Sequence, residues 1–309
     1  QGGGTRHTTE VAGPLGHPQD TPWVLDRDGT AIIAADEVCG LRLLSVSERD
    51  PLRTTTFGVG QLLAEARSVG ARRILIGLGG TATVDGGAGA LLGLNFRLQV
   101  SDGSGLKIGG EDLHRVARAD RGWSPHPFGV EVVLLADVTA TLLEAARIFG
   151  PQKGASEEDV ELLTQGLSAW AEVAERDLAA VGSVRNQPGS GAAGGLGFGL
   201  ACGLGATFVP GAAFIADRLG LPGAVERADL VITGEGRLDP TSTSGKVVGT
   251  IRDLCRQHRT KVAAVVGQAR TGDAELDAVI EAAPQGPGER PDVEVQQAAA
   301  QLAQRLSRG

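Results

Sequence analysis

Short apolar runs alternate with amphipathic stretches along most of the chain. Four runs have the unbroken apolar character of buried strands: RRILI (72–76), VEVVLLADV (130–138), ADLVI (228–232) and TKVAAVVG (260–267). Three stretches have the spacing of helices: residues 56–70, 156–181 and 293–307. Ser156 and the acids that follow it are typical of a helix N-terminus. Because strands alternate with helices, we expect an α/β fold whose sheet is mainly parallel towards the C-terminus.

The N-terminal part has a different pattern. Residues 8–44 show short alternating runs and an Asp28-Gly29 turn, which predict a β-hairpin or meander. Residues 100–128 are polar and rich in loop-forming residues. We therefore expect a mixed α/β domain over residues 1–225 and part of a parallel-sheet domain over residues 226–309.

One uncharged segment is long enough to cross a bilayer. Residues 189–216 contain many glycines, Pro210 and few large aliphatic side chains. That composition favours a buried helix behind a glycine loop over a membrane span.

The composition limits the classes of binding partner that we expect. Charged residues make up 21% of the 309 residues and the net charge is −8, which argues against a nucleic-acid surface. The three cysteines, Cys39, Cys202 and Cys255, are far apart and form no C-x-x-C pair. A structural zinc site is therefore not expected, and the sparse cysteines favour a reducing, cytoplasmic location.

The stretch GGTATVDGG follows the first buried run. Its glycines permit positive φ and close approach, so the N–H groups near Gly79 and Gly80 can turn towards an anion. Thr81 and Thr83 can add hydroxyl donors. Asp85 has the charge to bind Mg²⁺ or to take a proton from a hydroxyl. The alternative is a tight packing turn in which Asp85 caps a helix.

A second glycine-rich stretch, GSGAAGGLG, contains a G-x-G-x-x-G pattern. The residues before it do not form a strand pattern, so dinucleotide binding is disfavoured. Gly191, Gly194 and Gly195 can still cradle a phosphate, or they serve only tight helix packing.

The polar stretch after ADLVI is the strongest indication of a functional site in the sequence. Ligands of open α/β sheets bind at the carboxyl ends of strands. There, Arg237 and Lys246 can neutralise phosphoryl oxygens, while Glu235 and Asp239 can hold Mg²⁺. A surface loop of salt bridges is the alternative. Val247 stands where a P-loop needs Ser or Thr, so an ordinary P-loop is excluded.

Two further residues are weaker candidates. Asp137 ends the run VEVVLLADV, where it either serves a strand-end site or forms a turn. Lys153 lies in FGPQKGA, a turn before a helix, where a solvated lysine is the simpler interpretation.

The order of GGTATVDGG, FGPQKGA, GSGAAGGLG and TGEGRLD followed by GK resembles the type I glycerate kinase family. GPLG and RDPLRTTTFGVG add to the similarity, which covers nearly the whole chain. The resemblance implies ATP-dependent phosphorylation of D-glycerate, giving 2-phosphoglycerate in most members. It also implies a flavodoxin-like domain, incomplete here, with a larger inserted mixed α/β domain at residues 1–225. The family's N-terminal segment precedes residue 1, and its absence predicts an unstable sheet.

Residues and resemblance together give one set of expectations. We expect a kinase that uses ATP and Mg²⁺ on a small-molecule substrate, with no nucleic-acid or membrane partner. The expected catalytic residues are Asp85, Asp137 and Lys246, and the expected Mg²⁺ ligands are Asp137 and Asp239. The expected substrate- or phosphate-binding residues are Gly79, Gly80, Thr81, Thr83, Gly191, Gly194, Gly195, Glu235, Arg237 and Asp239. Val84 and Thr139–Thr141 depart from the family pattern, so a non-catalytic homologue or ligand-binding module is the alternative.

Overall fold

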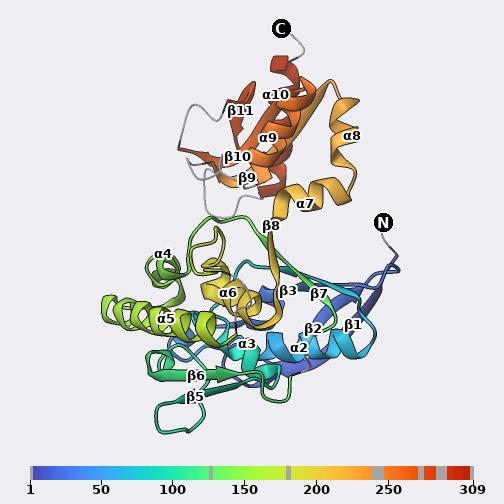
Figure 1. The fold of residues 1–309 in the computed structure, drawn as a ribbon. Helices are drawn as coiled ribbons and strands as arrows, with labels where there is room; N and C mark the ends of the chain where they lie inside the picture. Colours follow the sequence, from blue (N-terminus) through green and yellow to red (C-terminus); the bar gives the residue numbers. More distant parts are fainter. Residues whose placement is uncertain are drawn as a thin grey trace. The chain divides into compact units, whose positions relative to one another are not determined.

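The computed structural model describes residues 3–124, 128–178, 182–238, 247–270, 275–282 and 291–306. Contacts divide the chain into two compact units, Gln1–Val209 and Pro210–Gly309 (Figure 1). This division falls before the boundary that we placed near residue 225. The difference arises because α7 (Gly211–Arg218) and α8 (Leu221–Glu226) contact α9 (Val247–His258) of the second unit.

The first unit is built on a six-stranded mixed sheet. Its strands, in spatial order, are β1 (Thr5–Ala12), β2 (Pro18–Leu25), β3 (Thr30–Ala34), β4 (Arg73–Gly77), β7 (Glu131–Ala136) and β8 (Thr207–Pro210). The first three pair antiparallel, which confirms the predicted meander, whereas β3, β4 and β7 run parallel. A separate ribbon pairs β5 (Arg97–Val100) with β6 (Val116–Asp120), so the stretch predicted to be loop-rich contains a strand.

Six helices belong to the described part of this unit. They are α1 (Ala35–Cys39), α2 (Phe57–Ser68), α3 (Ala88–Gly93), α4 (Ala145–Phe149), α5 (Glu157–Asp177) and α6 (Ala192–Leu204). Short 3₁₀ turns are η1 (Leu41–Leu43), η2 (Val46–Glu48), η3 (Leu113–Arg115), η4 (Leu142–Glu144) and η5 (Pro151–Lys153). The Ser156 hydroxyl accepts a hydrogen bond from the Asp159 N–H at 3.2 Å, which confirms the predicted cap of α5. Side chains of β4, α2, α5 and α6 share one hydrophobic core.

The uncharged segment 189–216 begins with a glycine turn, and the buried helix α6 follows it, as predicted. Its 13 residues are nearly all buried, so its apolar character is explained by packing inside the protein. Within the described ranges, no helix combines the length and the apolar character needed to cross a bilayer.

The second unit contains a parallel sheet of β11 (Ala278–Glu281), β10 (Lys261–Ala269) and β9 (Leu230–Leu238), in that order. Successive residues of β10 point to opposite faces. Val262 packs with Val225 and Cys255, whereas Ala263 packs with Leu302 of α10 (Pro291–Leu306). Helices therefore cover both faces, which confirms the parallel α/β arrangement predicted for this end of the chain.

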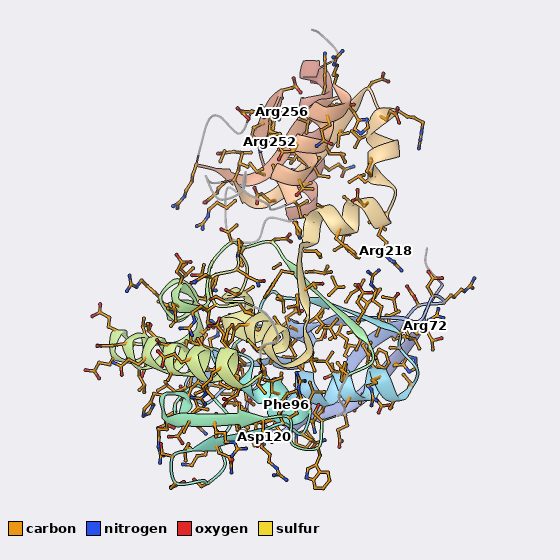
Figure 2. All side chains as sticks on the ribbon, in the orientation of Figure 1. Arg72, Phe96, Asp120, Arg218, Arg252 and Arg256 are labelled. Carbon is orange, nitrogen blue, oxygen red and sulfur yellow. The ribbon has the colours of Figure 1, made fainter. Side chains whose placement is uncertain are left out.

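Strand β9 is longer than predicted. We expected TGEGRLD to be a loop, but its first six residues continue the strand and pair with β10 up to Leu238 opposite Ala269. Glycine makes this close pairing possible: a Cβ on Gly234 would lie 2.5 Å from the carbonyl oxygen of Val265. Arg256 of α9, whose side chain is labelled in Figure 2, forms an ion pair with Glu275 at 2.5 Å.

Candidate active site

Three parallel strands of the first unit end at the same edge of the sheet. Ala34 of β3 pairs with Gly77 of β4, which pairs with Leu135 of β7. The loop after β4 begins there, and the Leu78 N–H donates to the Leu135 carbonyl oxygen at 3.0 Å. Asp137 follows β7 directly. This edge has the topology of a ligand crevice in an open α/β sheet.

Gly79 and Gly80 are the exposed residues of the first glycine loop. A Cβ on Gly79 would meet nothing within 4 Å, and Gly80 has a φ of +65°. Just beyond them the backbone is held firmly. The Gly80 carbonyl accepts from the Leu41 N–H at 2.8 Å, and the Ala82 N–H donates to the Cys39 carbonyl at 2.7 Å. Open backbone next to a fixed anchor suits the binding of a small anion.

Thr81 and Thr83 are buried, with exposed fractions of only 2% and 0%. The Thr81 hydroxyl accepts from the Lys153 ammonium at 3.3 Å, and the Thr83 carbonyl accepts from it at 2.7 Å. Burial raises the pKa of the Cys39 thiol, and the Thr83 hydroxyl acts in the opposite direction. Both threonines therefore bind the Lys153 ammonium inside the protein.

Lys153, a weak candidate in the sequence, is buried rather than solvated. Its side chain is buried at 3% exposure, although a lysine in a Gly/Pro turn is usually solvated. Burial lowers the pKa of Lys153 to about 8, while Cys39 and Asp85 act in the opposite direction. Burial, with Asp85, raises the pKa of the Cys39 thiol to about 12, so Cys39 stays a neutral, unreactive thiol.

The Asp85 carboxylate is fully buried and surrounded by donors. Its oxygens accept from the Thr56 N–H at 2.8 Å, from the Thr56 hydroxyl at 2.9 and 3.1 Å, and from the Gly87 N–H at 3.1 Å. Burial raises the pKa of Asp85, and the donors of Thr56 and Gly87 oppose that rise. The carboxylate therefore ties the turn before α3, whose N-cap is Gly87, to Thr56 at the start of α2.

The second glycine loop packs against the first. Gly191, Gly194 and Gly195 are buried, and the Gly194 carbonyl accepts from the Gly86 N–H at 3.0 Å. A Cβ on Gly194 would lie 1.9 Å from the Thr83 carbonyl oxygen, and one on Gly191 would lie 2.2 Å from that of Thr141. These glycines therefore permit contact between backbones, as the packing alternative required.

Asp137 is half-buried at the end of β7. The described residues contain no group of three or more His, Cys, Asp or Glu side chains that could hold a metal ion. Mg²⁺ in kinase sites, however, is commonly bound by one or two carboxylates together with substrate phosphates. Asp137 at the strand ends fits an ion that arrives with a nucleotide.

The second unit holds the remaining candidates. Glu235 and Arg237 lie on β9, where alternation places them on the same face of the sheet. One carboxylate oxygen of Glu235, Oε1, is buried and has no hydrogen-bond partner within the described residues. Asp239 and Lys246 lie outside the described residues.

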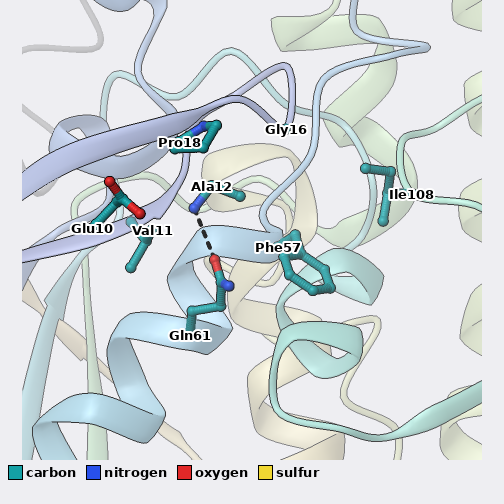
Figure 3. Close-up of a pocket in the computed structure, with 8 residues that line it drawn as sticks. All are labelled: Glu10, Val11, Ala12, Gly16, Pro18, Phe57, Gln61 and Ile108. Atoms are coloured by element: carbon teal, nitrogen blue, oxygen red, sulfur yellow. Dashed lines mark hydrogen bonds between the residues drawn. The ribbon is translucent and has the colours of Figure 1, made fainter.

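A cavity of about 310 Å³ opens elsewhere in the first unit, between β1, β2 and the start of α2 (Figure 3). It is lined mostly by apolar side chains, and the Gln61 side chain within it accepts from the Ala12 N–H at 2.8 Å. None of the predicted site residues lines it, so it is separate from the strand-end loops.

The described structure thus defines an α/β protein with two glycine loops that contact each other at its strand ends, which is an arrangement typical of anion-binding sites.

Comparison with known proteins identifies the family. The profile of the glycerate kinase family matches residues 1–308. The chain is 38% identical to glycerate 2-kinase of Escherichia coli (strain K12) over 270 residues, covering 86% of this chain and 70% of that protein. It is 37% identical to glycerate kinase of Bacillus subtilis (strain 168) over 262 residues, covering 83% and 68%.

A solved structure shares the fold. The crystal structure of a Salmonella typhimurium LT2 protein, provisionally described as glycerate kinase 2, superposes with a TM-score of 0.79. The two are 34% identical, and the match covers 100% of this chain and 84% of the other. The chain belongs to the glycerate kinase family, a family of enzymes, and the resemblance that its motifs showed is confirmed.

Proposed function

We propose that this protein phosphorylates D-glycerate with ATP as donor and Mg²⁺ as the accompanying ion, giving 2-phosphoglycerate. The family match over residues 1–308 carries the proposal, and the similarity to a glycerate 2-kinase supports the position of transfer. We also propose a flavodoxin-like parallel domain into which a mixed α/β domain is inserted, as the resemblance of the motifs implies. The three free, buried cysteines fit a reducing cytoplasm.

Phosphoryl transfer needs positioning and charge neutralisation more than covalent chemistry. We assign the exposed backbone of Gly79 and Gly80 to an anionic group of a substrate. Arg237 and Lys246 neutralise phosphoryl charge, and Asp137 contacts the Mg²⁺ that enters with ATP. Asp85 orders the loop, because its oxygens are already occupied by donors.

Glycerate-dependent release of ADP tests the proposal. With ATP and Mg²⁺ present, adding D-glycerate should start ADP release in a coupled assay, and ³¹P NMR should identify 2-phosphoglycerate. A folded chain that binds ATP but releases no ADP with glycerate would instead be a ligand-binding homologue. A product phosphorylated at the 3-hydroxyl would overturn the position of transfer alone.

Asp137→Asn should raise the Mg²⁺ concentration needed for half-maximal activity by about 10-fold or more, because losing even an outer-shell partner of a metal typically weakens its binding about 10–100-fold. Titrating Mg²⁺ at saturating ATP measures the shift. Asp102→Asn is the matched control, since Asp102 lies in an exposed turn where it accepts from the Ser104 N–H. Equal Mg²⁺ dependence in the two variants would rule out this role.

A further inference from the structure

Lys153 joins the first glycine loop to a separate part of the chain. It lies at the end of η5, and its ammonium contacts the loop at two points, the Thr83 carbonyl oxygen at 2.7 Å and the Thr81 hydroxyl at 3.3 Å. The Phe149 ring centroid lies 6.0 Å from Nζ. These contacts cross about seventy residues of sequence, so they fix the position of the loop relative to η5.

Burying a lysine is unfavourable unless its ammonium is compensated. The short contact with the Thr83 carbonyl is a charge-assisted hydrogen bond, which is roughly twice as strong as a neutral one. Gly154 follows Lys153 with a φ of +100°, and a Cβ there would lie 2.3 Å from the Arg49 carbonyl oxygen. The backbone of the turn is therefore tightly packed, and it keeps the lysine inside.

We propose that Lys153 is a positioning residue, which holds Thr81–Thr83 and so keeps the exposed backbone of Gly79 and Gly80 in the geometry that binds an anion. The effect on activity rests on the proposed kinase function. The effect on the loop itself does not.

Because the ammonium of Lys153 can lose its proton, the proposal predicts that the order of the loop depends on pH. The titratable groups that act on it are Cys39, from α1, and Asp85, from the loop. Cys39 stays neutral because its pKa is raised to about 12. As pH rises through about 8, Lys153 loses its proton and the charge-assisted bond to Thr83 weakens.

Global stability responds in the opposite direction. The folded-state pKa of Lys153 is depressed below its ordinary value, so between the two values the unfolded chain binds more protons. This group therefore contributes more to folding stability as pH rises, and that contribution is lost as pH falls through about 8. A loop that loosens while the fold gains stability distinguishes positioning from a purely structural role.

Hydrogen exchange of the Ala82 amide, which is bonded to the Cys39 carbonyl, tests the proposal without turnover. In Lys153→Met this amide should exchange about 10-fold faster or more, after correction for intrinsic rates, while core amides of β4 keep their protection. The kcat/KM for glycerate should fall by about 10²-fold, the scale of a small misplacement. Lys107→Met is the control, because that side chain is 81% exposed.

The wild-type chain provides a second measurement that needs no variant. Its Ala82 exchange, corrected in the same way, should accelerate between pH 7 and pH 9.5. Unchanged exchange over that range overturns the proposal even if Lys153→Met fails to fold, and so does a folded Lys153→Met whose Ala82 amide keeps its protection. A chain that fails the ADP-release assay but loosens at Ala82 would refute the proposed function and leave the role of Lys153 intact.

Discussion

Replacing Asp85 with alanine should lower the free energy of unfolding of the first unit by about 3 kcal/mol or more, because each buried donor left without a partner costs about 1–3 kcal/mol. The variant leaves the Thr56 N–H, the Thr56 hydroxyl and the Gly87 N–H without their carboxylate. Denaturant unfolding followed by tryptophan fluorescence measures the loss. All three tryptophans of the chain lie in the first unit, so the signal reports on that unit alone.

A matched pair of variants separates charge from hydrogen bonding. Burial raises the pKa of Asp85, so folding favours its protonated form, and its contribution to stability falls as pH rises through the folded-state pKa. Asp85→Asn keeps an acceptor but is neutral at every pH, so it should cost less than Asp85→Ala and remove this dependence. Asp102→Ala, in an exposed turn, should change stability by less than about 1 kcal/mol. A loss no larger in Asp85→Ala than in Asp102→Ala would contradict the role of the carboxylate as an anchor.

Gly194→Ala is expected to be comparably damaging, costing about 3 kcal/mol or more and most of the activity, through strain and displacement of a neighbouring backbone. Gly194 has a φ of +65°, and its Cβ would lie 1.9 Å from the Thr83 carbonyl oxygen. Backbone cannot move aside as the end of a side chain can, so the first glycine loop must shift. Unfolding by denaturant and glycerate-dependent ADP release should both register the change.

Gly205 supplies the control for backbone strain. It ends the same helix, α6, with a φ of +73°, but a Cβ there would meet nothing within 4 Å. Gly205→Ala should therefore cost only the left-handed conformation, about 1–2 kcal/mol. The difference between the two variants measures the clash with Thr83. Equal losses would show that the loops do not depend on this close approach.

Hydrophobic periodicity predicted the elements whose formation depends on local pattern. The helix that became α5 has an apolar face and a capping serine, and the run that became β7 is continuous and apolar. β9 shows the limit of this reasoning. Its second half is rich in glycine and charge, so its sequence suggests a loop, and only pairing with β10 makes it a strand.

The candidate site, like the fold, was predictable from the sequence only where a local pattern determines it. The sequence located both glycine loops, but it left two roles open for each, because the deciding partners are distant in sequence. Thr56 lies 29 residues from Asp85, and Lys153 lies 70 residues from Thr83. No local pattern marks Lys153 as buried, since its burial depends on tertiary packing around a turn that resembles a surface turn.

Contact between backbones also limits how these loops can be engineered. Where two side chains meet, a smaller residue on one side can compensate for a larger one on the other. Gly86 and Gly194 have no side chains to exchange, and their contact is a hydrogen bond between main-chain atoms. A library aimed at a new acceptor substrate should therefore leave Gly86 and Gly194 intact and vary the residues around them, because a side chain at Gly194 would displace the backbone of the first loop.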